Sequence, residues 1–547
     1  MSLQRRPPVA SHWWGPPAGG LLLALAYPPL NLLPLALLAP WPLLAFLETP
    51  DGIRPGRAFL GGYLFGLGHF GLLLYWIAGL SGFSAMAVPA YLASVLVLAA
   101  NGGLTALLVA AGRMRGVPVV IAFPLAWTAI EWLRGFGDLG FTWGVVGDVL
   151  ASYPLLIQPA ELGGAYLLSL WVMGLSSAMY RLLRPRRRTR PGRVAVATLV
   201  LAAMVPLYGW VRLADLERSL VGWPRLRVAA VQPNVPQDVK WDLAFVDETF
   251  ARLIRLTRLA ERHDPALVVW PESAVPVYLR YDARAAELVP RLASEIGEPI
   301  FTGTNDADTL DGRDGSLPGD YRVYNAAYLV RGGGLAEGRY AKRRLVPVAE
   351  RVPFVPDVAT GFFERLSSWT GQFAPGQGWP VWTIGGYAFG ATICYESVFP
   401  DVSRALVRSG ADFLVNITND AWFGPTAAPY QHASHLTLRS VEHRVSYLRS
   451  ANTGISGWVD PLGRYHDRTP LYDEAIVVAD LPMPGITTPY TRWGDWVPLV
   501  ALAAWAGLLL FGRKSFGAAG EPDLGASPLR RPRSRTAAAR DRVVGQN

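Results

Sequence analysis

Long apolar stretches almost without charged side chains are the feature that most constrains how this chain can fold. Residues 7–47 contain no Asp, Glu, Lys or Arg. Proline pairs interrupt this stretch at 16–17 and 28–29, so two short membrane spans fit it better than one long helix. Six further stretches approach the roughly 17–25 residues that a helix needs to cross a bilayer. They lie at about 58–80, 84–111, 117–133, 162–180, 194–211 and 496–512. We therefore expect about eight transmembrane helices.

Basic residues stand at every second connection between these predicted spans. They are Arg5 and Arg6, Arg54 and Arg57, Arg113 and Arg115, the segment RLLRPRRRTRPGR (181–193), and Arg513 with Lys514. Cytoplasmic loops of membrane proteins are enriched in Lys and Arg. The pattern predicts both termini in the cytoplasm and residues 212–492 on the opposite face. Nucleic-acid binding does not explain this regular placement beside the spans, so no nucleic-acid partner is expected.

The composition supports a membrane protein and singles out a few reactive side chains. Charged residues make up 17% of the chain, against roughly 25% in a typical soluble domain. Cys394 is the only cysteine, which excludes an intramolecular disulfide and a cysteine-based metal cluster. The 51 Lys and Arg residues include only three lysines, Lys240, Lys342 and Lys514. A retained lysine is therefore expected where a compact, titratable amine is needed.

Residues 212–492 are the only stretch outside the predicted cytoplasmic side that is long enough for a soluble domain. Short β-like runs alternate there with helical patterns. The runs lie at 226–234, 266–273, 299–306, 323–330, 387–396 and 411–420, and the helices at 245–262 and 400–409. This alternation predicts an α/β domain or a layered α-β-β-α domain.

These patterns divide the chain into four parts. Residues 1–211 form an N-terminal membrane domain with about seven transmembrane helices, and residues 222–485 form the soluble domain outside the cytoplasm. Residues 493–512 form a C-terminal transmembrane helix. Residues 515–547, rich in Ala, Arg, Gly and Pro, are expected to be a disordered basic tail in the cytoplasm.

Three reactive groups stand at or just after the ends of β-like runs in the soluble domain. They are Glu272 in VVWPES, Lys342 in YAKRRLVP and Cys394 in TICYES. Strand ends are where α/β sheets usually place their sites. A carboxylate can take the proton of a thiol, and an ammonium can stabilise the thiolate or a developing oxyanion. Together the three residues supply the base, electrophile and nucleophile of acyl transfer.

Each of these residues also has a structural interpretation. A lone strand cysteine is more often a small buried apolar residue, Glu272 fits a turn carboxylate, and Lys342 fits a surface charge. His432 and His435 in QHASH, with His443 on the same predicted helix, raise the question of a metal site. Their spacing is not that of HExxH and no acidic ligand is suitably placed, so no metal and no cofactor are expected.

The sequence around the three reactive groups resembles a known family. WPES, the Lys342 segment and CYE, in this order, resemble the carbon–nitrogen hydrolase (nitrilase) superfamily. The span layout and further motifs are similar to those of apolipoprotein N-acyltransferases. These motifs are EWLRG (131–135), GFTWG (140–144), VPQDVKW (235–241), KRRLVPVAE (342–350), NDAWFG (419–424) and ANTGIS (451–456). The resemblance covers roughly residues 10–512.

The resemblance implies a nitrilase-like sandwich that moves an acyl chain from a membrane phospholipid to a lipoprotein. The acceptor is the N-terminal amine of a diacylglyceryl cysteine. Cys394 is then the nucleophile that carries the acyl chain as a thioester in a ping-pong mechanism, Glu272 the general base and Lys342 the oxyanion-stabilising group. The positions that match supporting site residues are Glu350, Tyr395 and Glu396, and Trp241 matches one linked to acceptor handling. The resemblance also implies a monomer in the bacterial inner membrane, with its catalytic domain on the periplasmic face.

One motif departs from the family pattern, and one segment is predicted to meet the lipid. VPVAE has Val348 and Ala349 where an aromatic residue and a glycine are expected before Glu350, which affects the packing of this loop. Residues 354–373 carry large apolar side chains in a loop-like region, which suggests either a lid that dips toward the bilayer or a small satellite core.

Two other functions are compatible with parts of the sequence. A membrane-tethered amidase or nitrilase would need one span as an anchor, not eight. A transporter or scaffold whose outer domain only binds is disfavoured because charged residues are almost absent within the predicted spans.

Overall fold

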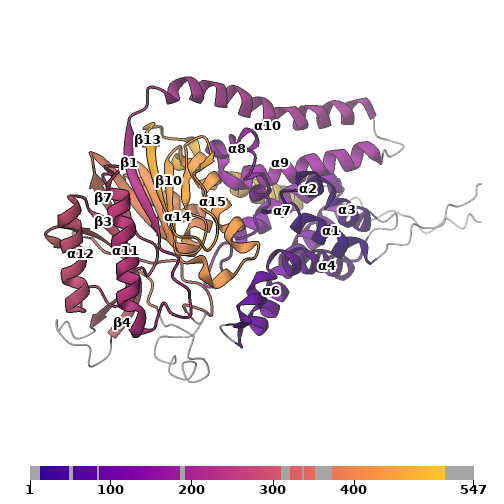
Figure 1. The fold of residues 1–547 in the computed structure, drawn as a ribbon. Helices are drawn as coiled ribbons and strands as arrows, with labels where there is room; N and C mark the ends of the chain where they lie inside the picture. Colours follow the sequence, from indigo (N-terminus) through magenta and orange to yellow (C-terminus); the bar gives the residue numbers. More distant parts are fainter. Residues whose placement is uncertain are drawn as a thin grey trace, which may run out of the picture.

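The computed structural model describes residues 13–48, 53–82, 85–184, 191–309, 321–335, 338–351 and 373–511. The basic tail from 515 lies outside the described residues, as does the predicted lid apart from Phe373. Figure 1 shows the N-terminal helices on one side of a two-sheet domain, with the long helix α10 running beside both.

The helical part follows the predicted apolar stretches. Its main helices are α1 (Gly15–Ala24), α2 (Leu33–Leu38), α3 (Trp41–Leu47), α4 (Pro55–Leu73), α6 (Ala87–Met114), α7 (Val119–Leu133), α9 (Ala160–Leu183), α10 (Pro191–Leu220) and α17 (Trp496–Phe511). Among the described residues, α6, α9 and α10 are long and apolar enough to cross a membrane. The expected number of eight spans stays a prediction.

The first apolar stretch folds differently from the expected pair of spans. It forms the three short helices α1, α2 and α3, and each has a proline in its first turn. Proline fits the first turn, where its missing N–H costs nothing, but it blocks continuation of a preceding helix. The prolines therefore divide residues 13–48 into more segments than the two proline pairs alone indicated.

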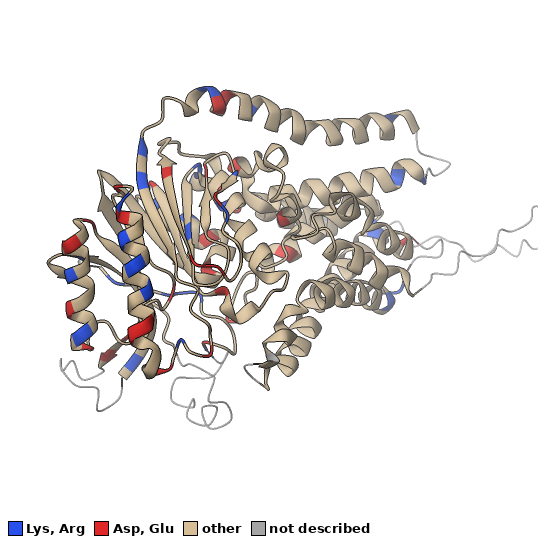
Figure 2. Cartoon of the chain, viewed as in Figure 1, with Lys and Arg blue, Asp and Glu red and all other residues tan. Residues whose placement is uncertain are grey.

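Charged side chains are distributed unevenly between the two parts. Figure 2 shows Lys, Arg, Asp and Glu concentrated on the sheet domain and its outer helices, whereas the N-terminal helices are almost free of them. Large apolar side chains on α10 are exposed, among them Leu199, Leu207 and Trp210. An apolar surface of this kind is stable in the hydrocarbon of a bilayer, in agreement with a membrane protein.

The first sheet of the α/β part has the strand order β13-β1-β2-β3-β4-β5, with β6 also paired to β4. Its strands are β1 (Arg225–Gln232), β2 (Val268–Val269), β3 (Ile300–Thr309), β4 (Tyr321–Arg331), β5 (Gly334–Leu335), β6 (Tyr340–Ala341) and β13 (Ala475–Pro482). The central strands β1, β2 and β3 are parallel. The helices α11 (Val246–Glu261) and α12 (Ala283–Ile296) cover its outer face.

The second sheet has the order β12-β11-β10-β9-β8-β7. Its strands are β7 (Val381–Ile384), β8 (Tyr387–Ile393), β9 (Phe413–Thr418), β10 (Ser446–Ala451), β11 (Gly457–Val459) and β12 (Tyr465–His466). The strands β8, β9 and β10 are parallel. The helices α14 (Pro400–Arg408) and α15 (Ala428–His443) pack on this sheet, on the side that faces the membrane helices (Figure 1).

The two sheets pack face to face, which gives the predicted α-β-β-α layering. Phe301 on β3 contacts Trp382 and Phe389 of the second sheet, with ring centroids 5.1 and 5.2 Å apart. The neighbouring Ile300 instead joins the core beneath α11 and α12. Successive strand residues point to opposite faces, so this alternation builds one core between the sheets and another under the helices.

Buried polar contacts join the α/β part to the membrane helices. Glu161 on α9 accepts a hydrogen bond from Arg444 Nε, at the end of α15, at 2.8 Å. Trp143 Nε1, in the loop after α7, donates to Gln431 Oε1 on α15 at 2.8 Å. The side chains of Arg444 and Trp143 are fully or almost fully buried. These contacts fix the second sheet, and the residues at its strand ends, relative to the membrane helices.

Candidate active site

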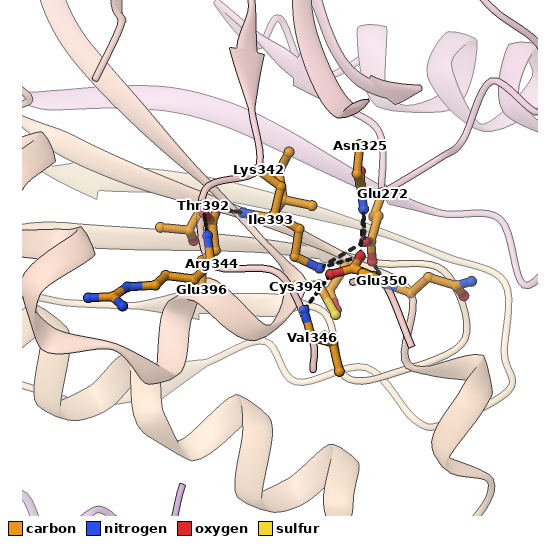
Figure 3. Close-up of polar contacts among 12 residues, drawn as sticks. Glu272, Asn325, Lys342, Arg344, Val346, Glu350, Thr392, Ile393, Cys394 and Glu396 are labelled. Atoms are coloured by element: carbon orange, nitrogen blue, oxygen red, sulfur yellow. Dashed lines mark hydrogen bonds and ion pairs between the residues drawn. The ribbon is translucent and has the colours of Figure 1, made fainter. Parts of the chain in front are cut away.

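The structure brings Glu272, Lys342 and Cys394 together at one end of the two sheets. Glu272 follows β2, Lys342 follows β6, and Cys394 follows β8. Because β2 and β6 belong to the first sheet and β8 to the second, the three side chains meet between the layers. Figure 3 shows the Cys394 sulfur, the Lys342 ammonium and the Glu272 and Glu350 carboxylates converging on a small region.

Lys342 is the cation of this cluster and is 1% exposed. Its Nζ lies 2.8 Å from Glu350 Oε1 and 3.7 Å from Glu272 Oε1. Burial disfavours the charged amine, but Glu350, Cys394 and Glu272 outweigh that effect and raise the pKa of Lys342. Lys342 therefore stays an ammonium at neutral pH, as an electrostatic partner for a thiolate or an oxyanion must.

Glu272 is held by donors on both carboxylate oxygens. Asn325 Nδ2 donates to Oε1 at 2.7 Å, and the backbone N–H of Asn419 donates to Oε2 at 2.8 Å. The amide of Asn325 also lies 3.2 Å from Glu350 Oε1, so it bridges the two carboxylates. These contacts fix the orientation of Glu272, which a general base requires.

Cys394 begins a 3₁₀ turn, Cys394–Val398, directly after β8. Its φ is +52°, in the left-handed region that non-glycine residues rarely adopt. Such strain is found preferentially at functional sites, where the surrounding structure holds it. The carbonyl oxygen of Cys394 accepts hydrogen bonds from His432 Nε2 at 3.0 Å and Asn416 Nδ2 at 3.3 Å. These donors hold the strained turn in place.

Cys394 is 8% exposed, and its thiol is not activated in advance. Burial, assisted by the charge of Glu272, raises its pKa to about 12, although Lys342 acts in the opposite direction. The sulfur is therefore protonated at neutral pH. The thiol needs a base within reach at the moment of attack, and the neighbouring Glu272 carboxylate fits that role.

Comparison with known proteins covers both parts of the chain. Residues 19–178 match the apolipoprotein N-acyltransferase N-terminal domain, and residues 227–488 match the carbon-nitrogen hydrolase family. An apolipoprotein N-acyltransferase of Geobacter metallireducens is 36% identical over 517 residues, which are 91% of this chain and 94% of the relative. The chain belongs to the apolipoprotein N-acyltransferase family. It is therefore an acyltransferase with a nitrilase-like catalytic domain.

A second relative supports this assignment. An apolipoprotein N-acyltransferase of Methylococcus capsulatus is 33% identical and covers 94% of this chain and 98% of its own length. Among solved structures, an amidase from Nesterenkonia sp. is 19% identical over 51% of this chain and 96% of its own, with a TM-score of 0.35.

Glu396 connects the turn that carries Cys394 to the segment that carries Lys342. Its Oε1 accepts from the backbone N–H groups of Arg343 and Arg344 at 2.7 and 3.1 Å. Its Oε2 accepts from Ile393 N at 2.9 Å and from the Tyr340 hydroxyl at 2.8 Å. Burial raises the pKa of Glu396, although these four donors favour its ionised form. In this member of the apolipoprotein N-acyltransferase family, Glu396 therefore fixes the Cys394 turn relative to the segment that carries Lys342.

Tyr395 and Trp241, the remaining predicted site residues, lie at the edge of the cluster. The Tyr395 ring packs on Phe399 and on Phe141 and Trp143 of the loop after α7, with centroids 4.9, 6.1 and 6.5 Å away. It thus joins the site to the membrane helices. Trp241 is 44% exposed, outside the buried cluster, and the Lys240 amine lies 5.8 Å from its ring centroid.

Several site residues were missed by the sequence analysis. Asn419 and Lys240 lie in the motifs NDAWFG and VPQDVKW, and Lys240 is one of three lysines, but the sequence alone predicts no role for either residue. Lys240 Nζ donates to the backbone carbonyl of Glu272 at 3.0 Å. Asn325 lies inside β4 and carries no local signal. His432 was considered only as a metal ligand, whereas it pairs with Asp420 at 2.9 Å and supports the Cys394 carbonyl.

The three histidines of α15 face different partners. His435 Nδ1 lies 3.4 Å from Asp148 Oδ2, and His443 Nδ1 lies 2.8 Å from the Thr491 hydroxyl. His432 contacts Asp420 and Cys394, as described above. Within the described ranges, no group of three potential ligands that could hold a metal ion was found.

Proposed function

We propose that this protein transfers an acyl chain from a membrane phospholipid to the N-terminal α-amino group of a diacylglyceryl apolipoprotein, through a thioester on Cys394. The observation that carries the proposal is the convergence of a buried thiol, a buried ammonium and an oriented carboxylate (Figure 3). Membership of the apolipoprotein N-acyltransferase family supports the choice of acceptor.

The first step forms the acyl-enzyme. Glu272 takes the proton of the Cys394 thiol while the sulfur attacks the ester carbonyl of the phospholipid. The ammonium of Lys342 stabilises the negative charge that develops on the carbonyl oxygen. Glu272 then gives its proton to the departing glycerol oxygen, and a lysophospholipid leaves.

The second step transfers the acyl chain to the amine. The acceptor amine attacks the thioester carbonyl while Glu272 takes one proton from its nitrogen, and Lys342 again stabilises the oxyanion. The carbon–sulfur bond breaks, and Cys394 recovers a proton from Glu272. Glu350 keeps Lys342 charged and in place, Tyr395 and Glu396 hold the Cys394 turn, and Trp241 meets the acceptor at the edge of the site.

The location of the site suits a donor that stays in the bilayer. Moving an acyl chain into water costs about 0.8 kcal/mol for each exposed CH₂, so the reacting carbonyl must be reached at the membrane surface. Tyr395 packs against the loop after α7, which supports a site beside the membrane helices. In the proposed arrangement the protein is a multi-pass monomer of the bacterial inner membrane, with its catalytic domain, residues 222–485, on the periplasmic face and both termini in the cytoplasm.

Mass spectrometry of the intact protein tests this proposal. The purified protein is incubated with phospholipid in detergent micelles, and we expect a mass increase of one acyl chain on Cys394. Cys394→Ala removes the adduct, and Glu272→Gln slows its formation by about 10²–10⁴-fold because the general base is lost. Arg225→Gln, an exposed change on β1, serves as the control and leaves acylation unchanged. An acyl adduct that persists in Cys394→Ala would exclude the thioester, and ammonia release from small amides without lipid dependence would favour an amidase.

A further inference from the structure

A second lysine lies beside the catalytic carboxylate. Lys240, at the end of the VPQDVKW segment, is 3% exposed and donates to the Glu272 carbonyl oxygen at 3.0 Å. Asn419 ties the same segment to the site, because its side chain donates to Gln237 at 2.8 Å while its backbone N–H holds Glu272. The Lys240 amine is thus built into the site, and the steps described above give it no role.

The charged and titratable groups that face this amine are Glu272 and Cys394. The hydrogen bond of Lys240 goes to a backbone carbonyl, whereas Lys342 pairs with Glu350 and Glu272. The two lysines therefore differ in kind. Lys342 is a fixed cation held by two carboxylates, whereas Lys240 is a buried amine whose hydrogen-bond partner is neutral.

The proton balance of the amine step requires a further proton acceptor. In the first step a thiol proton ends on a glycerol oxygen, so protons balance. An α-amino group is largely an ammonium at neutral pH. When this ammonium becomes an amide, its nitrogen loses two protons. One of them restores the Cys394 thiol. In the overall reaction of the amine step, an ammonium and a thioester therefore give an amide, a thiol and one free proton.

Neither the catalytic groups nor the neighbouring Glu350 can take that proton while the reaction proceeds. Glu272 is occupied by the proton destined for Cys394, and Lys342 is held as an ammonium. Glu350 has both carboxylate oxygens engaged, by Lys342 and Asn325 on one side and the backbone of Val346 on the other. Among the described residues that surround Glu272, this leaves Lys240.

We propose that Lys240, as a neutral amine, accepts the second proton of the acceptor ammonium in the amine step. The inference rests on the proposed function. The N–H bond of the acceptor breaks, a new N–H bond forms at Lys240 Nζ, and the resulting ammonium returns the proton to solvent between turnovers. Trp241, the next residue, is 44% exposed, so the chain reaches the surface directly after Lys240.

The protonation state of Lys240 agrees with this role. Burial lowers the pKa of Lys240 to about 8, against the opposing effect of Glu272 and Cys394. About one tenth of the molecules then carry the neutral amine at pH 7, and about half at pH 8. An ordinary lysine would offer far less of the basic form.

Single-turnover kinetics separate the two steps. The enzyme is first acylated with phospholipid, and a diacylglyceryl-cysteine peptide is then added while the thioester is followed by mass spectrometry. In Lys240→Met we expect acylation within about threefold of the wild-type rate and the amine step slowed about 10²-fold, the usual effect of losing a proton acceptor. Lys240→Arg keeps the charge but cannot act as a base, so it shows the same defect.

A different acceptor peptide should rescue the amine step of Lys240→Met. A peptide with an aminooxy group in place of its α-amine is neutral at pH 7 and releases no extra proton on acylation. We expect Lys240→Met and wild type to deacylate at rates within about threefold of each other with this acceptor. Asp238→Asn, which alters an exposed charge on the same segment, is the control and changes neither step.

Besides recovery in Lys240→Arg, three results would overturn the inference. These are equal slowing of both steps in Lys240→Met, an unchanged amine step, and failure of the aminooxy acceptor to restore the rate. Recovery of the amine step in Lys240→Arg would instead assign Lys240 a purely electrostatic role and also overturn it. Where Lys240→Met does not fold, Lys240→Gln replaces it in the same assays. Absence of any acyl adduct on the wild-type protein would refute the proposed function itself, a result distinct from all of these.

Discussion

The ammonium of Lys342 lies 2.8 Å from a carboxylate oxygen of Glu350, and only 1% of the Lys342 side chain is exposed. The pair lies beside Glu272 and Cys394, so its charge balance affects every ionisable group of the site. A buried ammonium without its carboxylate is strongly destabilised. Glu350 is therefore the nearer of the two carboxylates that keep Lys342 charged.

Glu350→Gln should weaken both folding and catalysis. The amide retains the size of the side chain but removes the charge that holds Lys342, at a cost of about 3–5 kcal/mol for breaking a buried pair. We expect a lower thermal unfolding temperature in detergent and much slower acylation of Cys394, measured by intact mass. Arg227→Gln, which breaks an exposed ion pair with Asp480, is the comparison and should have almost no effect on either quantity. Unchanged acylation in Glu350→Gln would mean that Lys342 does not depend on this partner.

Glu396→Gln should displace Cys394 without changing the chemistry of its thiol. The amide nitrogen of glutamine cannot accept the hydrogen bonds that one of the Glu396 oxygens now accepts, so at least one buried donor loses its partner at about 1–3 kcal/mol. Displacement of Cys394 relative to Lys342 by a fraction of an ångström should slow acylation by about 10–100-fold. The measurement is the rate of adduct formation at saturating phospholipid.

A neighbouring carboxylate provides the matched control for Glu396. Asp401 at the start of α14 is exposed and pairs with the Arg344 side chain at 2.5 Å. Asp401→Asn should change stability by less than about 1 kcal/mol, as is usual for surface ion pairs. Equal effects of the two substitutions on acylation would contradict a specific positioning role for Glu396.

Val348→Gly should stabilise the loop that carries Glu350. Val348 has a φ of +69° and is 38% exposed, and a β-branched residue in the left-handed region is strained by about 1–3 kcal/mol. Glycine relieves this strain but costs about 0.5–1 kcal/mol in chain entropy. We expect a net gain of about 1 kcal/mol, seen as a higher unfolding temperature, whereas Val348→Ala should gain less. A lower stability of the glycine variant would show that packing of the valine side chain outweighs the backbone strain.

His443→Gln should reduce the sensitivity of the protein to acid. Burial, assisted by Arg439 and Arg404, lowers the pKa of His443 to about 3, whereas the unfolded chain has a histidine pKa near 6.5. The folded state therefore excludes a proton that the unfolded state binds. Stability is fully present above pH 6.5 and falls as the pH drops from there toward 3.

The loss through His443 at pH 5 is about 2 kcal/mol. We expect the unfolding temperature of His443→Gln, relative to wild type, to rise between pH 7.5 and pH 5. His263→Gln replaces an exposed histidine after α11 and should show no such trend. A constant difference between His443→Gln and wild type across this pH range would contradict the predicted linkage.

The sequence by itself predicted the parts of this protein that local patterns encode. Apolar stretches predicted the apolar helices of the N-terminal part and α17, although prolines divided the first stretch into three helices instead of two. Alternating β-like runs predicted β1, β3, β4, β8 and β9 within a few residues. The positions of Glu272, Lys342 and Cys394 after apolar runs predicted that they lie at strand ends, because a strand must end where polar side chains leave the core.

The tertiary structure alone decided which groups meet at those strand ends. Asn325 bridges Glu272 and Glu350, His432 supports the Cys394 carbonyl, and the Lys240 amine lies against Glu272. These partners come from different strands, a helix and a loop, and the segments between them are long. Local periodicity indicates on which side of a strand or helix a residue lies, but it does not indicate which distant residue it contacts. That second property depends on how the two sheets pack, and it determines the charge, burial and proton affinity of each group in the site.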